Sequence, residues 1–256
     1  MATNPPTHLT LLTGASRGMG LAMAHQLLRP GHLLVCISRH ASAELANAAT
    51  QAGAALEQWE QDLSQGPAVA EQLRAWLAAQ PVGRFASATL INNAGVIPRI
   101  APLSASDPAD LANALRVGLE APMLLTAAFL GATEGWNLPR KVLNISSGLG
   151  RRAMASQAAY CAAKAGMDHF TRCVALDEAL KPQGAKVCSL APGVIDTDMQ
   201  VQLRGAPSEA FPDRQNFANL KTGGQLTQPA DAATRVLAWL ERADFGTHPV
   251  ADVRDA

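Results

Sequence analysis

Two hydrophobic periodicities alternate along this chain from one end to the other. Short aliphatic and β-branched runs predict strands, and longer segments with apolar residues three or four positions apart predict helices. The predicted strands are Leu9–Thr13, Leu33–Ser38, Ala55–Glu60, Ala88–Asn92, Lys141–Ser146 and Ala185–Leu190, with a short last one near Val250. The predicted helices are Leu21–Leu28, Ala43–Ala52, Ala68–Ala79, Leu111–Leu130, Ala158–Leu180 and about Pro229–Arg242. This alternation predicts an α/β fold, in which a doubly wound parallel sheet of about seven strands carries helices on both faces.

The pattern indicates one domain. No linker rich in Pro, Gly or Ser interrupts it and no internal repeat is visible, so residues 1–256 are predicted to form a single domain. The one long irregular stretch, at about 193–228, contains several glycines and prolines. A connection of that length within a compact domain usually has a function, and we expect it to form a flap over the substrate site.

Composition excludes several classes of function. The 256 residues are 48% apolar and 16% charged, and 21 Lys and Arg balance 21 Asp and Glu. Because the net charge is zero, no global field attracts nucleic acid or an anionic membrane, and no apolar run approaches the roughly 18 residues of a membrane span. The six histidines and four cysteines show no metal-ligand spacing, so no metal site is expected. Cysteines inside apolar runs and the lack of a secretory signal predict a cytoplasmic protein.

A glycine-rich loop lies between the first predicted strand and the first predicted helix. It holds Gly14, Gly18 and Gly20 in the sequence Thr-Gly-Ala-Ser-Arg-Gly-Met-Gly. Glycines let the backbone turn sharply and approach a pyrophosphate, and the following helix offers free N–H groups and the positive end of its dipole. The alternative is a tight strand-to-helix turn without a ligand, but the strand and the helix lie where a dinucleotide-binding loop requires them.

Three side chains are suited to proton transfer at a carbonyl oxygen. Tyr160, the only tyrosine, and Lys164 lie one turn apart on one face of a predicted helix. Ser147 follows the fifth predicted strand, at the sheet edge where the glycine loop also lies, and Ser146 is the alternative serine. A free tyrosine has a pKa of about 10, and a nearby ammonium should lower that pKa so that the phenol exchanges a proton near neutral pH.

Together these motifs resemble the short-chain dehydrogenase/reductase family, whose fold is of the Rossmann type. The spacing Gly-x-x-x-Gly-x-Gly, the sequence Asn-Asn-Ala-Gly at 92–95, the pair Tyr-x-x-x-Lys and a serine thirteen residues before the tyrosine occur in family order. The resemblance implies catalytic roles for Ser147, Tyr160 and Lys164, and its spacing favours Ser147 over Ser146. It also implies a nicotinamide cofactor bound by Gly14, Ser16, Arg17, Gly18, Met19, Gly20, Arg39, Asp62, Leu63, Asn92, Ala94, Gly95, Tyr160, Lys164, Pro192, Gly193, Ile195 and Thr197.

The end of the second predicted strand favours NADP(H) as that cofactor. An enzyme that prefers NAD usually has an acidic residue there for the ribose 2′-hydroxyl, whereas this strand ends in Ser38 and Arg39. Arg17 in the glycine loop and Arg39 can form charge-assisted bidentate hydrogen bonds to a 2′-phosphate. The alternative is that both arginines are solvated surface residues.

One position departs from the family pattern. The family commonly has a fourth catalytic residue, an asparagine, within a Val-Asn-Leu segment that reads Val117-Gly118-Leu119 here. Gly118 has no amide, so a proton relay through that side chain is absent. Our hypothesis is that a water molecule takes its place and connects Lys164 to solvent. A gain of orders of magnitude in the turnover rate of Gly118→Asn would contradict it.

The last third of the chain narrows the substrate. Its Asp-Thr-Asp-Met-Gln segment at 196–200 and its acidic C-terminus resemble the sepiapterin reductase and bacterial benzil reductase members of the family, which reduce a pterin side-chain ketone or a vicinal diketone. The resemblance implies an NADPH-dependent carbonyl reductase whose substrate contacts Ser147, Tyr160, Met199 and Asp252, with Asp252 anchoring a pterin ring. A terminal acid exposed to solvent is the alternative for Asp252. A β-ketoacyl thioester or other small-ketone reductase and a non-catalytic NADP(H)-sensing protein are the alternatives for the function.

Two helices also predict self-association. Both are rich in alanine and poor in charged residues: Leu111–Leu130 and Ala158–Leu180. Each has more apolar positions than a helix needs to bury one face against its own sheet. Members of the family pair such helices across a two-fold interface, so we expect a homodimer or a homotetramer.

Overall fold

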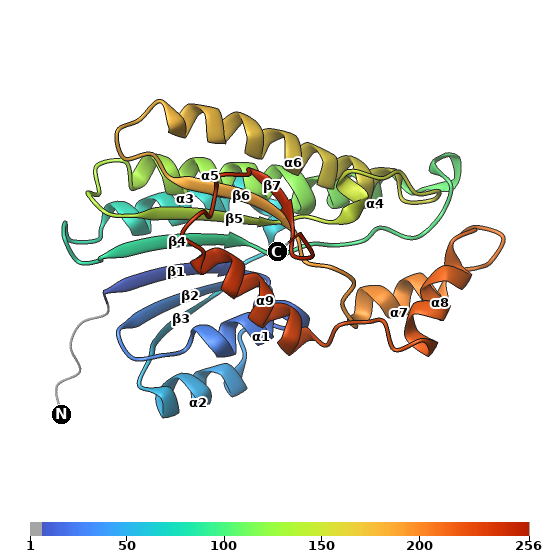
Figure 1. Ribbon diagram of the computed structural model, residues 1–256, viewed down its shortest axis with the longest axis horizontal. Helices are drawn as coiled ribbons and strands as arrows, with labels where there is room; N and C mark the ends of the chain where they lie inside the picture. Colours follow the sequence, from blue (N-terminus) through green and yellow to red (C-terminus); the bar gives the residue numbers. More distant parts are fainter. Residues whose placement is uncertain (1–6, 256) are drawn as a thin grey trace.

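The computed structural model describes residues 7–255 and contains one sheet of seven parallel strands in the order β3-β2-β1-β4-β5-β6-β7 (Figure 1). The strands are β1 (His8–Thr13), β2 (His32–Ser38), β3 (Ala55–Glu60), β4 (Ser87–Asn92), β5 (Arg140–Ile145), β6 (Lys186–Ala191) and β7 (Val250–Asp252). The predicted doubly wound α/β fold is confirmed. Because the strand order reverses between β1 and β4, a crevice forms there at the carboxyl ends of the strands.

Helices cover both faces of the sheet (Figure 1). On one face lie α1 (Gly18–Leu27), α2 (Ala43–Ala52) and α9 (Pro229–Glu241). On the other face lie α3 (Gly66–Ala78), α4 (Pro108–Leu115), α5 (Ala121–Ala132) and α6 (Ala158–Ala179). Two more helices, α7 (Asp198–Gly205) and α8 (Arg214–Thr222), project beyond the carboxyl end of β6.

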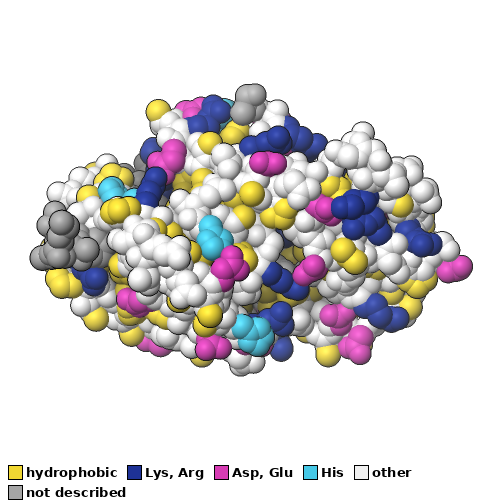
Figure 2. Space-filling view, turned by 90° about the horizontal axis from the view of Figure 1, so that it is seen from below, with side chains coloured by type: hydrophobic (Ala, Val, Ile, Leu, Met, Phe, Trp, Pro, Cys, Tyr) yellow, Lys and Arg dark blue, Asp and Glu magenta, His cyan; other side chains and the backbone are white. Residues whose placement is uncertain are grey.

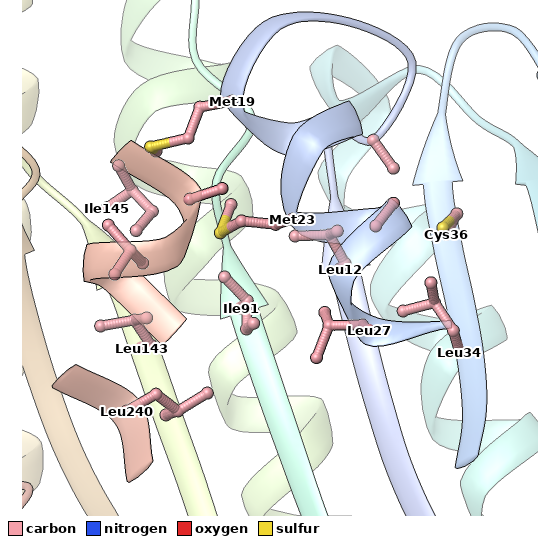
Figure 3. Close-up of a cluster of buried hydrophobic side chains, with 14 of the residues drawn as sticks. Leu12, Met19, Met23, Leu27, Leu34, Cys36, Ile91, Leu143, Ile145 and Leu240 are labelled. Atoms are coloured by element: carbon pink, nitrogen blue, oxygen red, sulfur yellow. The ribbon is translucent and has the colours of Figure 1, made fainter. Parts of the chain in front are cut away.

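The core has two layers, one on each face of the sheet. Neighbouring strand residues point to opposite faces, so Leu11 belongs to the layer under α3 and α5 whereas Leu12 belongs to the layer under α1 and α9. Figure 3 shows the second layer, where Met23 of α1 and Leu240 of α9 pack against Leu12 and Leu143 of the sheet. Burial on both faces explains why these strands are continuously apolar in sequence.

The long helix expected at Leu111–Leu130 has an irregular turn. A π-helical turn at Arg116–Glu120 joins α4 to α5, and the N–H of Ala121 bonds to the carbonyl of Arg116. Pro122 has no N–H for the carbonyl four residues earlier, and an extra residue in the preceding turn accommodates it. Among residues 7–255, the continuous stretch 108–132 is the one helix with the length and hydropathy of a membrane span, but half of its apolar window is buried in the protein. It packs on α3 as a core helix of the fold.

The prediction that 193–228 is irregular is wrong, because this segment contains α7 and α8. Phe211, between the two helices, is fully buried and stacks on Phe217 with ring centroids 5.6 Å apart. Together with Leu203 of α7 these rings form a small third core that orders the segment. The polar composition of α8, which buries none of its residues, conceals its helical periodicity in the sequence.

The surface has no single-sign field on the face seen in Figure 2, where basic and acidic side chains are interspersed. Within residues 7–255, no group of three His, Cys, Asp or Glu side chains could hold a metal ion. The four cysteines are free thiols.

Candidate active site

A cavity of about 1040 Å³ lies at the carboxyl ends of the strands, where the strand order reverses. Its walls come from the loops after the first six strands and from α6, α7 and the C-terminal segment. Every residue predicted to catalyse, to bind cofactor or to contact substrate lines this cavity, with the exception of Asn92. This volume suits a dinucleotide together with a small substrate.

The glycine loop forms one end of the cavity. Gly14 has a φ of +71°, and a Cβ there would lie 2.8 Å from the Cα of Ala94, so the loop packs directly on the segment after β4. A Cβ on Gly20 would overlap the carbonyl of Gly14. Helix α1 begins at Gly18, and no side chain caps its first N–H groups. These free donors, at the positive end of the helix dipole, fit the pyrophosphate of a dinucleotide.

Two polar residues join the glycine loop to the segment after β4. The Asn93 amide donates to the carbonyls of Thr13 and Gly14, at 3.0 and 3.2 Å. The hydroxyl of Thr13 accepts from the N–H groups of Asn93 and Ala94, at 2.9 and 3.0 Å. Asn92 is the residue whose predicted cofactor contact is not supported, because it is buried behind the cavity wall and its amide donates to Asn144 at 2.8 Å. Asn93, rather than Asn92, therefore lines the cavity.

The adenosine end of the cavity carries both predicted arginines. Arg39 follows β2, lines the cavity and is exposed. Arg17 differs from the prediction, because its guanidinium bonds to the carboxylate of Asp198 at 2.9 Å. Both of these side chains are more than half exposed, so the pair is weak and Arg17 can exchange Asp198 for a phosphate. Asp62 lines the same region, and its carboxylate accepts from the N–H of Ser64 at 2.9 Å.

The predicted catalytic side chains converge at the centre of the cavity. Ser147 directly follows β5, and its hydroxyl accepts from the N–H of Leu149 at 3.1 Å. Tyr160 and Lys164 come from the first turns of α6, and only 8% and 4% of their surfaces are exposed. The Lys164 ammonium donates to the carbonyl of Ile145 at 2.7 Å and lies 5.8 Å from the centroid of the Tyr160 ring. A serine hydroxyl, a phenol and an ammonium thus share one small space.

The electrostatics of this centre differ from the sequence-based expectation. Burial raises the pKa of the Tyr160 phenol, and its hydrogen bond with Ser147 only partly opposes that rise. The predicted lowering of this pKa is therefore wrong: burial, which disfavours the phenolate, is the largest effect, and Lys164 is not among the groups that shift the pKa. Burial also lowers the pKa of Lys164 from 10.5 to about 8, against the opposing effect of Asp168. At neutral pH the phenol therefore carries its proton, ready to donate it.

A buried carboxylate organises the strand ends behind the catalytic residues. Asp168 lies one turn after Lys164 and is 1% exposed. Its carboxylate accepts from the hydroxyls of Ser146 and Ser189, each at 2.6 Å, and from Arg151 at 3.2 Å. The two candidate serines differ in their contacts, because Ser146 is bonded to Asp168, whereas Ser147 is hydrogen-bonded with Tyr160.

The region of the missing family asparagine contains a different amide. Gly118 lies in the π-helical turn and does not line the cavity, and a Cβ there would lie 3.1 Å from the Cβ of Ala163 on α6. Asn113, more than one turn earlier on α4, does line the cavity. Sequence reasoning missed Asn113 because it lies outside the family segment.

The end of the cavity that is predicted to hold the substrate is lined by residues of α7 and of the C-terminal segment. Met199, Gln200 and Leu203 line it from α7, and the side-chain oxygen of Gln200 is buried without a partner among residues 7–255. Asp252 ends β7 and is 5% exposed, so a frayed, exposed acid is excluded. Both of its carboxylate oxygens accept from the guanidinium of Arg254, at 2.8 and 2.6 Å.

This fold and site agree with comparisons to known proteins. A family model described as short chain dehydrogenase matches residues 8–207. The chain belongs to that family. A benzil reductase ((S)-benzoin forming) from Bacillus cereus is 34% identical over 235 residues, which cover 92% of this chain and 94% of the relative. A sepiapterin reductase from Meriones unguiculatus is 32% identical over 255 residues, covering 96% and 95%.

A solved structure extends the comparison to cofactor binding. A metagenomic short-chain oxidoreductase in complex with NADP has a TM-score of 0.70 and 27% identity to this short-chain dehydrogenase, covering 97% of this chain and 96% of that one. The predicted family is thus confirmed, and the chain is an oxidoreductase of that family.

Proposed function

We propose that this short-chain dehydrogenase is an NADPH-dependent carbonyl reductase that acts on a vicinal diketone or a pterin side-chain ketone. The observation that carries the proposal is the convergence of Ser147, Tyr160 and Lys164 in one cavity with the uncapped start of α1. Relatives that are a benzil reductase and a sepiapterin reductase over nearly the whole chain support the two substrate classes.

The chain's own groups supply the proton side of the reaction. When bound, NADPH supplies the hydride. Ser147 donates a hydrogen bond to the carbonyl oxygen and thereby orients it. Tyr160, protonated at neutral pH because burial raises its pKa, donates its proton to that oxygen as negative charge develops there. Lys164 holds a positive charge beside this oxygen and is anchored by the carbonyl of Ile145.

NADP(H) is the proposed cofactor because β2 ends in Ser38 and Arg39 without an acid for a ribose 2′-hydroxyl. Arg39 is exposed at the adenosine end of the cavity, and Arg17 adds a second guanidinium once it leaves Asp198. An NADP-bound structural neighbour supports the same choice.

We propose that α7 and α8 form the substrate flap predicted at 193–228. Met199 and Leu203 of α7 and Phe217 of α8 line the cavity, so the two helices wall it at the substrate end. A diketone with apolar substituents would bury these substituents against this wall.

A homodimer is the proposed assembly, and the cytoplasm is the proposed compartment. Leu115 of α4, Met123 of α5, Leu176 of α6 and Leu180 directly after α6 are exposed by 39%, 46%, 71% and 87%, and pairing these helices with a second copy would bury such side chains. Four free thiols suit a reducing compartment. Light scattering at micromolar concentration should give at least twice the 26.8 kDa chain mass, and a monomeric mass would refute the assembly.

The decisive experiment follows NADPH absorbance with benzil, 1-phenyl-1,2-propanedione, sepiapterin and an acetoacetyl thioester. Turnover of a diketone or sepiapterin is expected. Turnover of the thioester alone would favour the alternative of a β-ketoacyl reductase. NADPH binding without turnover of any of them would mean that the protein only senses the cofactor.

A further inference from the structure

The C-terminal segment presents an ion pair to the substrate end of the cavity. Asp252 and Arg254 both line the cavity, as do Arg151 and Arg152. The Asp252 carboxylate is 7% exposed, whereas the Arg254 side chain is 68% exposed. The acid is therefore buried, and the guanidinium bonded to it belongs to an exposed side chain that also lines the cavity.

Arg254 and Asp252 form a bidentate ion pair, in which two parallel N–H groups of the guanidinium bond to the two carboxylate oxygens; this arrangement is called the fork below. Arg254 donates from Nε to Asp252 Oδ1 at 2.8 Å and from Nη2 to Oδ2 at 2.6 Å, and its backbone N–H donates to Oδ1 at 3.0 Å. Two parallel N–H bonds to a carboxylate are the strongest form of this contact. The fork also holds the pKa of Asp252 below its usual range, which keeps the carboxylate ionised and paired.

The guanidinium of Arg254 occupies Asp252 in the way that a particular kind of ligand would. A 2-amino-4-oxopyrimidine ring, such as that of a pterin, presents an exocyclic N–H and a ring N–H side by side, as the Nε and Nη2 of a guanidinium do. Such a ring can reach Asp252 only by displacing Arg254. Because Arg254 is two residues from Asp252 in the same chain, its effective concentration is high and the displacement is unfavourable.

The charged groups left facing the cavity are hydrogen-bond donors, and the side-chain oxygen of Gln200 is an acceptor there without a partner among residues 7–255. Arg254 Nη1 has no partner among residues 7–255, and an arginine has no acceptor atom. Arg151 is held by Asp168 and by the carbonyl of Ala251, and Arg152 forms no ion pair within the described residues. The charged side chains at this end of the cavity thus match oxygen acceptors rather than ring amines.

We propose that Arg254 determines substrate specificity by occupying the carboxylate of Asp252. The site then favours a ketone whose second polar group is a hydrogen-bond acceptor, such as the second carbonyl of a vicinal diketone. It disfavours a substrate that would bind Asp252 through the N–H groups of an aminopyrimidine ring. The proposal rests on the proposed reductase function and chooses between its two substrate classes.

The test compares Arg254→Met, which keeps the aliphatic stem but lacks the fork, with the full-length wild-type protein. Steady-state KM and kcat are measured for 1-phenyl-1,2-propanedione and sepiapterin, and calorimetry measures biopterin binding to the protein saturated with NADP⁺. Arg242→Met is the matched control, because Arg242 forms the same fork with Asp244, at 2.8 and 2.9 Å, outside the cavity. Thermal melts verify that each variant is folded.

Arg254→Met should tighten biopterin binding and lower the KM for sepiapterin by about tenfold or more, because a charge-assisted competitor is gone. The KM for the diketone should rise about three- to tenfold with kcat nearly unchanged, since a positioning donor is lost. In the double variant Arg254→Met/Asp252→Asn the gain for biopterin should disappear. Arg242→Met should change none of these values.

Unchanged biopterin affinity and an unchanged ratio of the two KM values in Arg254→Met would overturn the proposal. So would a gain for biopterin that persists in the double variant, because Asp252 would then not be the group that Arg254 covers. If the wild-type protein reduces neither ketone, the proposed function fails, while the calorimetric comparison still tests the role of Arg254.

Discussion

Replacing Lys164 by methionine should abolish turnover and yet make the folded protein more stable near neutral pH. Lys164 is 4% exposed, and its ammonium donates to a single carbonyl, that of Ile145, at 2.7 Å. A methionine fills a similar volume without placing a charge in the interior. Lys164 is thus a residue that the proposed reaction requires although its buried charge lowers the stability of the folded protein.

The magnitude follows from the pKa of this group. Burial lowers the pKa of Lys164 from 10.5 to about 8. Each unit corresponds to about 1.4 kcal/mol, so below pH 8 the ionised Lys164 destabilises the folded state by about 3 kcal/mol relative to a neutral group. Methionine removes this penalty but loses the hydrogen bond to Ile145, which contributes about 1 kcal/mol net. The expected gain near pH 7 is therefore about 2 kcal/mol.

The gain should depend on pH with a defined sign. Between pH 8 and pH 10.5 the unfolded chain binds more protons at this lysine than the folded chain does, so wild-type stability rises with pH across that window. The methionine variant has no such group. Its advantage should therefore shrink above pH 8 and vanish by about pH 10.

Urea unfolding of both proteins at a series of pH values from 7 to about 10 measures these differences as shifts in the midpoint at constant m. The control is Lys186→Met, at an exposed lysine of β6, where no such pH-dependent difference is expected. A Lys164→Met protein less stable than wild type near pH 7, or an advantage that stays constant up to pH 10, would refute this reasoning.

Three further substitutions test individual parts of the site. Tyr160→Phe should bind NADPH normally in a fluorescence titration but lose about 10²–10⁴-fold in kcat, because only the proton donor is removed. Retention of more than a tenth of the wild-type kcat would exclude Tyr160 as the proton donor. Arg39→Asp should shift the NADPH/NADH ratio of kcat/KM about ten- to hundredfold towards NADH, and an unchanged ratio would make Arg39 a surface residue only. Asp168→Asn should lower the free energy of unfolding by about 2–3 kcal/mol, because the asparagine amide cannot accept hydrogen bonds from Arg151, Ser146 and Ser189 together. A change below about 1 kcal/mol in urea unfolding would show that this network contributes little.

The features that the sequence determined are those that depend on local geometry. Strand and helix periodicities come from the backbone itself, so the order of elements, the doubly wound sheet and the glycine loop follow from residues close together in the chain. The pairing of Tyr160 with Lys164 follows from the helical repeat. Pro122 inside an apolar helix was a local signal for the π-helical turn, although the periodicity alone predicted a regular helix.

The tertiary structure alone decided what depends on partners distant in sequence. The sequence distinguishes Ser147 from Ser146 only through the family spacing, whereas the folded chain separates them physically, because Asp168, 22 residues later, bonds to Ser146. The pKa of Tyr160 is raised and not lowered, because burial by the surrounding elements is the largest effect on it. Helices α7 and α8 are stabilised by a small core around Phe211 rather than by their own polar sequences. The sequence left Asp252 open between a buried and an exposed acid, and the burial of its side chain follows from the pairing of β7 with β6, which lies far earlier in the chain.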